Sequence, residues 1–239
     1  MLAELQDISK YYEQPGSGIR NVILNQVTLG IDAMDAIAIV GPSGSGKSTL
    51  LNMLGTLDKP SAGRVIIDGT PTDGLDDNRL AMIRNQYIGF VFQLHHLLPQ
   101  LTLLENVLLP ALPQKDKSMQ KITKDKTTEK LTLERAHYLI ERVGLASQVY
   151  HRPGQMSVGE CQRAAVVRAL INQPRLLLAD EPTGSLDAEN ASHLGHLLSE
   201  LNQEQNLAVV LVTHSLELAS MMRKIYKLTS GKLQLIESR

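Results

Sequence analysis

A glycine-rich segment at residues 41–49, GPSGSGKST, carries residue types that can bind a triphosphate. It follows the apolar run AIAIV at 36–40 and opens a stretch with helical apolar spacing, which is the strand–loop–helix context that this pattern requires. Glycines let successive backbone N–H groups surround a phosphate, and the helix start adds partial positive charge. We expect Lys47 to reach the β- and γ-phosphates and Ser48 to ligate Mg²⁺. The predicted ATP-binding residues are Gly41, Pro42, Ser43, Gly44, Ser45, Gly46, Lys47, Ser48 and Thr49, and the apolar residues of the expected helix are Leu50, Leu51, Met53, Leu54 and Leu57.

Two carboxylates follow another apolar run, LLLAD at 176–180. The run carries Asp180 to the end of a buried strand, which is where ligands bind in parallel α/β sheets. Asp180 can hold Mg²⁺ through the water shell of the ion, and Glu181 can accept a proton from an attacking water. The alternative is that the two carboxylates only cap the next helix.

A third apolar run, LAVVLVTH at 207–214, ends in His214. A histidine at this edge of the sheet can polarise the γ-phosphate and orient the attacking water. A lone histidine at a strand end is usually structural. Here three strand ends converge on one ligand, which favours the functional interpretation.

These runs alternate with helical patterns, which predicts an α/β fold with a mostly parallel sheet. Nearly continuous apolar runs are typical of strands that are buried on both faces. Shorter strand-like segments before residue 40 and at 63–69 indicate an antiparallel β flank. Between about 94 and 170 the apolar spacing becomes helical, so we expect an α-helical subdomain inserted into a single domain of residues 1–239.

Composition excludes several classes of protein. With 239 residues, 43% of them hydrophobic and 21% charged, the chain can form a substantial core. The net charge of −1 gives no overall field toward nucleic acid or an anionic membrane. The single cysteine, Cys161, excludes an internal disulfide and suits a reducing compartment. We see no signal peptide and no apolar run of about 18–20 residues, so a soluble, cytoplasmic chain is expected.

The segment at 114–130, QKDKSMQKITKDKTTEK, is rich in lysine and poor in large apolar residues. Such a composition is typical of a solvated loop or an exposed helical turn. The alternative is contact with anionic lipid headgroups, which attract nearby lysines.

The segment at 155–163, QMSVGECQR, permits two interpretations. Ser157 and Glu160 have the S-x-x-E spacing of a capping box, which would only start a helix. The same helix start exposes backbone N–H groups that can bind a phosphate, so the two interpretations are compatible. If Ser157 is the N-cap, Val158 is the first helical residue and costs little free energy in helix propensity. If Val158 instead needed a positive φ, the valine would be strained and the phosphate-binding helix start would be distorted.

These motifs, in this order, resemble the nucleotide-binding subunits of ABC transporters, and the resemblance covers essentially the whole chain. It implies a RecA-like P-loop NTPase core with ATP and Mg²⁺ as its ligands. Gln93, after YIGFVF, resembles the Q-loop glutamine of the family, which senses Mg²⁺ and the γ-phosphate. Asp187, in PTGSLD, resembles the D-loop aspartate at the subunit boundary. Tyr12 falls where the family has an aromatic residue that stacks on adenine, and Tyr11 is the alternative.

The signature of the family, LSGGQ or LSGGE, corresponds here to MSVGE at 156–160, with Val158 in place of a glycine. The resemblance implies a head-to-tail homodimer in which this segment of one copy caps the ATP held by the other copy. The residues involved would be Ser157, Val158, Gly159 and Glu160. We expect this phosphate-binding helix start to be modified but working, with measurable ATP hydrolysis that is slower than in a Val158→Gly variant.

Within the family, residues 83–112 are similar to the ATPases of lipoprotein-releasing systems, and MacB-type export ATPases are the alternative. This implies ATP hydrolysis that energises integral membrane permease subunits, through which the chain is attached to the cytoplasmic face of the inner membrane. A catalytically impaired regulatory cassette is a further alternative. ABC ATPases that act on DNA or ribosomes usually carry a second cassette, a coiled coil or a basic addition, so we expect no nucleic-acid partner.

Overall fold

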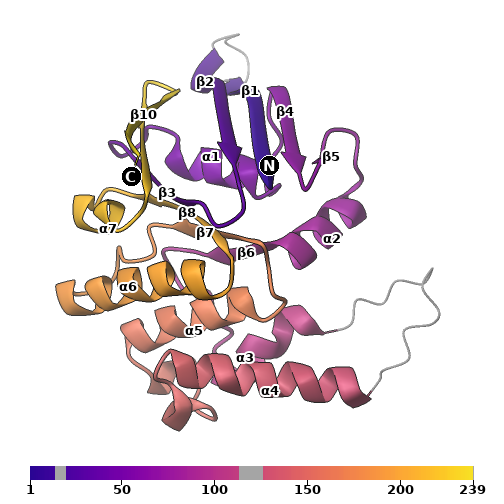
Figure 1. Cartoon of the computed structure of the whole chain (residues 1–239), viewed down its shortest axis with the longest axis vertical. Coiled ribbons are helices and arrows are strands. Elements are labelled where there is room, and N and C mark those ends of the chain that lie inside the picture. The colour runs from indigo at the N-terminus through magenta and orange to yellow at the C-terminus, as the bar shows by residue number, and fades with distance from the viewer. Residues whose placement is uncertain (14–19, 113–125, 239) are drawn as a thin grey trace.

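The computed structural model describes residues 1–13, 20–112 and 126–238, which form two β-sheets and several layers of helices (Figure 1). The strands of these ranges are β1 (Ala3–Glu13), β2 (Arg20–Ile31), β3 (Ala36–Val40), β4 (Ala62–Ile67), β5 (Thr70–Pro71), β6 (Ile88–Val91), β7 (Leu176–Asp180), β8 (Ala208–Thr213), β9 (Lys224–Thr229) and β10 (Lys232–Ser238). The α-helices are α1 (Lys47–Leu54), α2 (Asp77–Tyr87), α3 (Leu103–Leu108), α4 (Lys126–Arg142), α5 (Val158–Leu170), α6 (Ala188–Glu204) and α7 (Leu216–Ser220).

The larger sheet has the strand order β10-β9-β3-β8-β7-β6. Neighbouring strands from β9 to β6 are parallel, and β10 pairs antiparallel with β9. The three apolar runs predicted to be buried strands are β3, β7 and β8, and nearly all their residues are buried. The predicted α/β fold with a mostly parallel sheet is confirmed.

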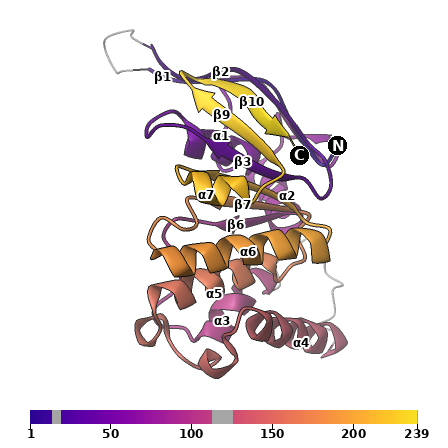
Figure 2. The same ribbon diagram turned by 60° about the vertical axis from the view of Figure 1, so that its left-hand side comes forward.

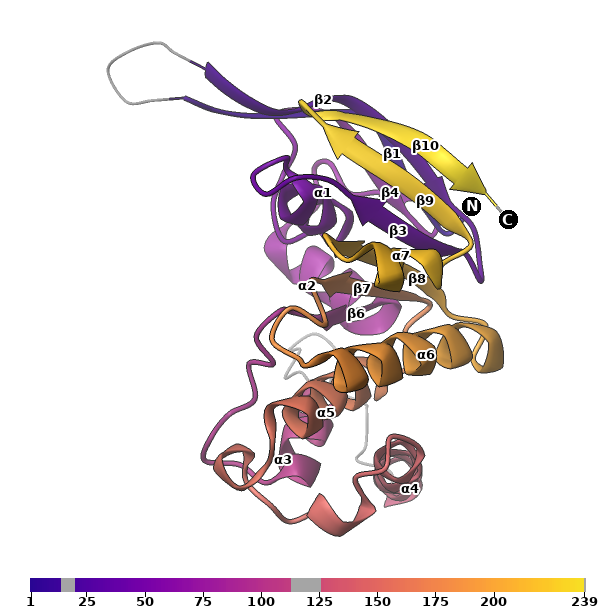
Figure 3. The ribbon, with the colours of Figure 1, turned by 90° about the vertical axis from the view of Figure 1, so that its left-hand side faces the viewer.

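Alternate residues of the central strands contribute to two different cores, because successive side chains of a strand point to opposite faces. Ile37 and Ile39 of β3 pack in the core that contains the apolar residues of α1. Ala36, Ala38 and Val40 pack in the core that contains α5, α6 and α7. Helix α1 therefore lies on one face of the sheet and α5 on the other, as Figure 3 shows.

The smaller sheet, β2-β1-β4-β5, is antiparallel and covers α1 on the side away from the parallel sheet (Figure 3). It meets the β9–β10 hairpin, where Asn25 N donates a hydrogen bond to Gly231 O at 2.8 Å (Figure 2). This sheet is the antiparallel flank expected from the shorter strand patterns. Helix α1 is thus held between two sheets.

Helices α3, α4 and α5 pack on one another at the end of the molecule opposite to the antiparallel sheet (Figure 1). They account for the helical pattern between residues 94 and 170. Residues 114–125 of the lysine-rich segment lie outside the described residues. In the ranges that the structure describes, no helix has both the length and the apolar composition needed to cross a bilayer.

One boundary differs from the expectation. Helix α1 ends at Leu54, with Gly55 at its C-cap, and Thr56 has a φ of 54°. Glycine after a helix and a left-handed residue next to it end the helical path. Leu57 therefore leaves the helix and is exposed, so the prediction that it belongs to the apolar face of this helix is wrong.

Candidate active site

The carboxyl ends of β3, β8, β7 and β6 lie side by side, because each strand pairs with its neighbour up to or next to its last residue. The strands are parallel, so the segments that follow them leave the sheet at the same edge. This edge brings together the phosphate loop at 41–49, Gln93, the Asp180–Glu181 pair and His214. All of them were selected from the sequence as site residues.

The phosphate loop passes directly into α1, which begins at Lys47. Gly46 is the N-cap of the helix and has a φ of 98°, in the left-handed region that favours glycine. Lys47 is only 8% exposed, and its Nζ donates hydrogen bonds to Gly41 O at 2.9 Å and to Pro42 O at 3.1 Å. The ammonium group is therefore held inside the loop, where a phosphate can meet both this charge and the helix N-terminus.

The hydroxyl of Ser45, in the same loop, is buried and has no hydrogen-bond partner among the described residues. A buried polar atom without a partner costs free energy. A bound phosphate oxygen would accept this hydrogen bond. The orphaned hydroxyl therefore supports a ligand site and argues against a glycine-rich turn that binds nothing.

Ser48 and Asp180 lie 132 residues apart in the sequence and meet at the end of β7, where Ser48 Oγ donates to Asp180 Oδ1 at 3.0 Å. Burial raises the pKa of Asp180. The hydrogen bond from Ser48 lowers this pKa, and the negative charge of Glu181 raises it, so that the net pKa lies above the ordinary value. A cation would stabilise these carboxylates. Carboxylate oxygens suit Mg²⁺. Among the described residues, no group of three or more His, Cys, Asp or Glu side chains is arranged to hold a metal ion by itself. The donor set thus fits Mg²⁺, which keeps water and phosphate ligands.

Glu181 turns away from the strand through a left-handed conformation with a φ of 44°, which residues other than glycine rarely adopt. Its carboxylate Oε2 accepts a hydrogen bond from His214 N at 3.2 Å, and it lies 2.9 Å from His214 Nδ1. The Glu181 side chain is 15% exposed and that of His214 is 71% exposed. The pair therefore offers a mostly buried proton acceptor next to an accessible imidazole. Local strain of this kind is found at functional sites.

Asp187 caps the helix that follows Glu181. It is the N-cap of α6, and its carboxylate accepts hydrogen bonds from Asn190 N at 2.9 Å and from Asn190 Nδ2 at 3.0 Å. The hydrogen bond from the Asn190 amide lowers the pKa of Asp187. The alternative that the Asp180–Glu181 pair only caps the next helix is therefore wrong. The role of Asp187 at a subunit boundary stays a prediction.

Gln93 follows the end of β6, and its side chain is exposed. Its Nε2 lies 3.1 Å from the position that a Cβ of Gly184 would occupy. The amide therefore faces the segment that follows Glu181, close to the end of β7. Its predicted contact with Mg²⁺ and the γ-phosphate is compatible with this place and remains a prediction.

Tyr12 lies on β1, whose partner strand β2 approaches the phosphate loop through Ile23. The Tyr12 side chain is exposed, although Lys10 Nζ lies 5.1 Å from the centroid of its ring. Tyr11 is less exposed, and the guanidinium of Arg20 lies 4.6 Å from its ring centroid. The greater exposure favours Tyr12 as the surface for an adenine, and this role also stays a prediction.

Helix α5 begins at Val158, with Ser157 as its N-cap. Ser157 Oγ accepts from Glu160 N at 3.2 Å, and Glu160 Oε2 accepts from Ser157 N at 2.7 Å. The predicted capping box is confirmed. Val158 is helical and 53% exposed, so its side chain points to solvent and no left-handed conformation is needed. Gly159, the next residue, is buried.

We expect Ser157→Ala to lower the free energy of unfolding by about 1 kcal/mol, because it removes the N-cap acceptor.

The hydrogen bond from Ser157 N lowers the pKa of Glu160. A carboxyl group with a lowered folded-state pKa stabilises the fold above its ordinary pKa, and this stabilisation is lost as the pH falls through the folded-state pKa. Urea denaturation should therefore show that Glu160→Gln costs stability at neutral pH and little at an acidic pH at which Glu160 is protonated in the folded chain. Equal losses at both pH values would contradict this account.

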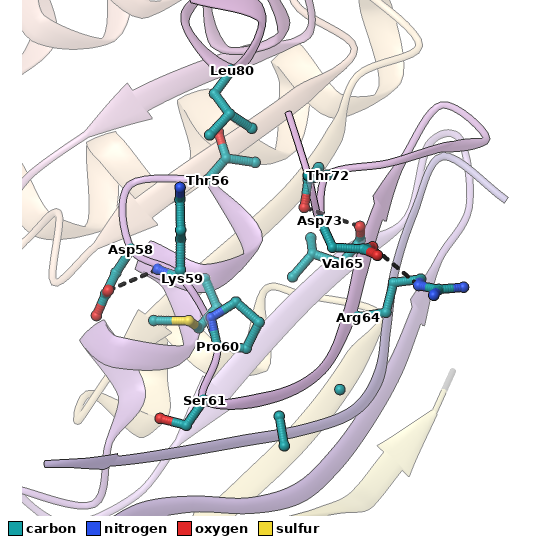
Figure 4. Close-up of a pocket in the computed structure, with 14 residues that line it drawn as sticks. Thr56, Asp58, Lys59, Pro60, Ser61, Arg64, Val65, Thr72, Asp73 and Leu80 are labelled. Atoms are coloured by element: carbon teal, nitrogen blue, oxygen red, sulfur yellow. Dashed lines mark hydrogen bonds and ion pairs between the residues drawn. The ribbon is translucent and has the colours of Figure 1, made fainter. Parts of the chain in front are cut away.

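A cavity of about 240 Å³ lies between the end of α1, β4 and the segment after β5 (Figure 4). Three of its charged side chains have partners: Arg64 Nε pairs with Asp73 Oδ1 at 3.0 Å, and Asp58 Oδ1 accepts from Lys59 N at 2.7 Å and from Lys10 Nζ at 2.8 Å. No predicted site residue lines the cavity among the described residues. Its connection to the site is Asp58, which also accepts from the Tyr12 hydroxyl at 3.3 Å.

Two side chains that contact predicted site residues were missed by the sequence analysis. Asn190 binds Asp187, and its Oδ1 accepts from Arg163 Nη1 of α5 at 3.4 Å. The spacing D-x-x-N from an N-cap to the first helical turn is a signal that could have identified Asn190. Asp58 holds the Tyr12 hydroxyl across 46 residues, and no local pattern signals that contact.

A parallel sheet with a phosphate loop after one strand, and with a carboxylate that suits a metal and a second carboxylate directly after it at the end of a nearby strand, has the arrangement of a P-loop nucleotide hydrolase. The chain matches the ABC transporter family over residues 24–184. It belongs to this family and is one of its ATPase cassettes.

Two curated relatives have similar lengths. The chain is 45% identical to the lipoprotein-releasing system ATP-binding protein LolD of Saccharophagus degradans over 211 residues, which cover 88% of each chain. It is 44% identical to LolD of Shewanella oneidensis over 238 residues, which cover 100% of this chain and 98% of the relative.

Two solved structures of the cassette MJ0796 are also similar, each 38% identical over 99% of both chains. One is a dimeric structure described as a bacterial ABC transporter cassette, with a TM-score of 0.85. The other is a dimeric post-hydrolysis state bound to ADP and Pi, with a TM-score of 0.86.

Proposed function

We propose that two copies of this chain form the ATPase of a lipoprotein-releasing complex of the LolCDE type. The chain binds integral permease subunits like LolC and LolE, which attach it to the cytoplasmic face of the inner membrane. It is one nucleotide-binding domain, whose helical subdomain, at about 94–170, contacts the permeases. The identity of 44–45% to LolD over most or all of the chain supports this assignment.

The observation that carries the enzymatic part of the proposal is the contact between Ser48 and Asp180 beside the buried ammonium group of Lys47. A loop that binds phosphate, a carboxylate that suits a metal and a separate proton acceptor are the parts that phosphoryl transfer needs. In this chain, neighbouring strands bring all of them to one edge of the sheet.

The second copy completes each site. Helices α1 and α5 lie on opposite faces of the sheet of one chain (Figure 3), so the helix start at Ser157 does not serve the phosphate loop of its own chain. In a head-to-tail pair, Ser157 and Gly159 of one copy bind the phosphates held by Lys47 of the other, since a helix N-terminus attracts anions. The similarity to dimeric cassette structures supports this arrangement.

Hydrolysis breaks the bond between the γ-phosphorus of ATP and the β–γ bridging oxygen when water attacks the phosphorus. Glu181 accepts the proton of that water, and His214, whose Nδ1 lies 2.9 Å from the carboxylate, orients Glu181 and faces the γ-phosphate. Lys47 stabilises the negative charge that develops on the phosphate oxygens. Ser48 and Gln93, and Asp180 through water, would hold Mg²⁺, which would supply further positive charge at these oxygens. Gln93 aligns the phosphate end of ATP from the opposite side of the site.

The test is reconstitution of the chain with its permease subunits in vesicles that contain a lipoprotein. We expect ATP, and not ADP, to cause release of the lipoprotein to an acceptor. ATP-driven export of another cargo without lipoprotein release would favour a MacB-type system. A complete complex that does not hydrolyse ATP would instead indicate a regulatory cassette.

Val158→Gly should raise the ATPase rate by less than about tenfold, which corresponds to less than about 1.4 kcal/mol in the barrier. The exposed isopropyl group stands at the helix start that faces the nucleotide of the other copy, and glycine removes it. Steady-state kinetics of the assembled complex measure the effect, and Val158→Thr, which keeps the branched shape, should leave the rate unchanged. Conversion of an inert complex into an active one by Val158→Gly would show that the valine abolishes catalysis.

A further inference from the structure

Two side chains of α5 hold the loop that carries Gln93. Gln162 Nε2 donates to Phe92 O at 2.8 Å. Arg168 donates twice, from Nη1 to His96 O at 2.6 Å and from Nη2 to His95 O at 2.8 Å. These hydrogen bonds lie on both sides of Gln93 in the sequence, so the backbone is fixed just before and just after this residue.

The chain contacts α5 from the end of β6 into the loop. Gly89 of β6 packs so closely on the helix that a Cβ would lie 2.5 Å from Ala169 O. Phe92 O then accepts from Gln162, which lies seven residues nearer the start of α5 than Ala169, and four residues later His96 O accepts from Arg168. At about 1.5 Å per residue, Gln162 and Arg168 lie about 9 Å apart along the helix axis. Gln93 therefore lies in a loop that is bound to one helix just before and just after it.

The loop needs these bonds, because residues 92–102 form no regular helix or strand. In such a segment the backbone carbonyls have no partners in a helix or sheet, and side chains of α5 donate to three of them. Bonds from a charged guanidinium are stronger than neutral ones. Gln162 is only 1% exposed, and its Oε1 has no partner in the described part of the chain. The bond from Nε2 to the loop is therefore the polar contact that this buried amide makes through its side chain.

The same helix starts at the edge that faces the other copy. Ser157 and Glu160 fix its first turn through the capping box. From Val158 to Leu170, α5 is continuous. Its start therefore belongs to the same rigid element as Gln162 and Arg168, which donate hydrogen bonds to the loop. A displacement of the helix start moves the loop that carries Gln93 with it.

We propose that Gln162 and Arg168 are positioning residues, which keep Gln93 in register with the helix start at 157–159. Contact of that helix start with the nucleotide of the other copy then determines where Gln93 stands in the site of its own chain. Neither residue touches the nucleotide; both act through Gln93. This inference rests on the proposed function, in which the helix start and Gln93 serve the two ATP molecules of one dimer.

The first test compares Gln162→Met and Arg168→Gln with a matched control, Arg135→Gln. Arg135, on α4, also donates to two backbone carbonyls, those of Leu170 and Ile171, but these lie at the end of α5 and not in the loop. We expect the two α5 variants to lower kcat by about tenfold or more with KM for ATP within about twofold, because misplacement of a group costs rate while the phosphate loop is intact. Arg135→Gln should lower thermal stability to a similar extent and keep kcat. Equal kcat losses in all three variants would overturn the proposal.

A double variant separates positioning from general destabilisation. If Arg168 acts through Gln93, Gln93→Ala combined with Arg168→Gln should be no slower than Gln93→Ala alone, because coupled residues are not additive. Arg168→Lys, which keeps one charged donor, should recover part of the rate. A double variant that loses the product of the two single factors would refute the role, and so would a Gln93→Ala variant with the wild-type rate.

Hydrogen exchange of the full-length chain without nucleotide tests the inference independently of ATPase activity. Amides of residues 93–98 should exchange faster in Gln162→Met and Arg168→Gln than in the wild type, and Arg135→Gln should leave them unchanged. Unchanged exchange in the α5 variants would overturn the proposal even if the chain hydrolyses ATP. A wild-type chain that failed to hydrolyse ATP in the complex would defeat the proposed function, while the exchange result would still decide whether α5 holds the loop.

Discussion

Glu181→Gln should reduce kcat by about 10²–10⁴-fold and leave KM for ATP nearly unchanged. The glutamine side chain has the same shape and can still accept the hydrogen bond that His214 N donates to Glu181 at 3.2 Å. What it loses is the ability to take a proton from water. Binding of ATP depends on the phosphate loop and is retained, so the dimer should remain closed on unhydrolysed ATP.

Two measurements check this result: steady-state ATPase kinetics, and size-exclusion chromatography with ATP and Mg²⁺, in which the dimer should accumulate. Glu217→Gln is a matched control, because Glu217 lies three residues after His214 on the first turn of α7 and is exposed. It should keep the wild-type rate and form no trapped dimer. A Glu181→Gln variant that hydrolysed ATP at the wild-type rate would remove Glu181 from its role as proton acceptor.

Asp180→Asn should have opposite effects on activity and stability. Loss of the carboxylate weakens the metal site, so we expect the Mg²⁺ concentration for half-maximal ATPase to rise by about 10–100-fold. Burial raises the pKa of Asp180, so the chain without ligand is destabilised by the ionised carboxylate as the pH rises above the ordinary aspartate pKa. Asparagine removes that charge and can still accept the hydrogen bond from Ser48. The variant should therefore unfold at a higher temperature than the wild type at neutral pH.

Thermal unfolding without nucleotide, at neutral and at acidic pH, measures the second effect. The gain should disappear below the ordinary aspartate pKa, where Asp180 is protonated in both states. Asp187→Asn is the control of opposite sign. Hydrogen bonds from Asn190 lower the pKa of Asp187, so its charge is favourable in the folded chain and its removal should not raise the unfolding temperature. If Asp180→Asn were less stable than the wild type at neutral pH, the account of its burial would be wrong.

Much of the site can be predicted from local patterns. The strands β3, β7 and β8 are apolar runs, and the phosphate loop, Asp180 and His214 follow them directly in the sequence. The capping box of α5 is a spacing of three residues. Such features are visible because helices, strands and caps depend on residues that are close together along the chain.

Local patterns also failed at an identifiable point. The apolar spacing extends to Leu57, but α1 ends at Leu54 because Gly55 and the left-handed Thr56 change the direction of the chain. Asn190 has a local signal that was overlooked. Asp58, Gln162 and Arg168 contact residues that lie 46 to 73 positions away in the sequence. No local sequence pattern predicts those contacts.

The sequence by itself therefore determined the class of fold, the binding of a triphosphate and which residues follow the central strands. Only the tertiary structure decided that Ser48 meets Asp180, that Glu181 turns back toward His214, and that α5 grips the loop of Gln93. The physical reason is the distance along the chain over which each kind of interaction acts. Periodic burial is recorded in neighbouring residues, whereas a hydrogen bond of about 3 Å between distant segments requires the order of the strands and the direction of each turn.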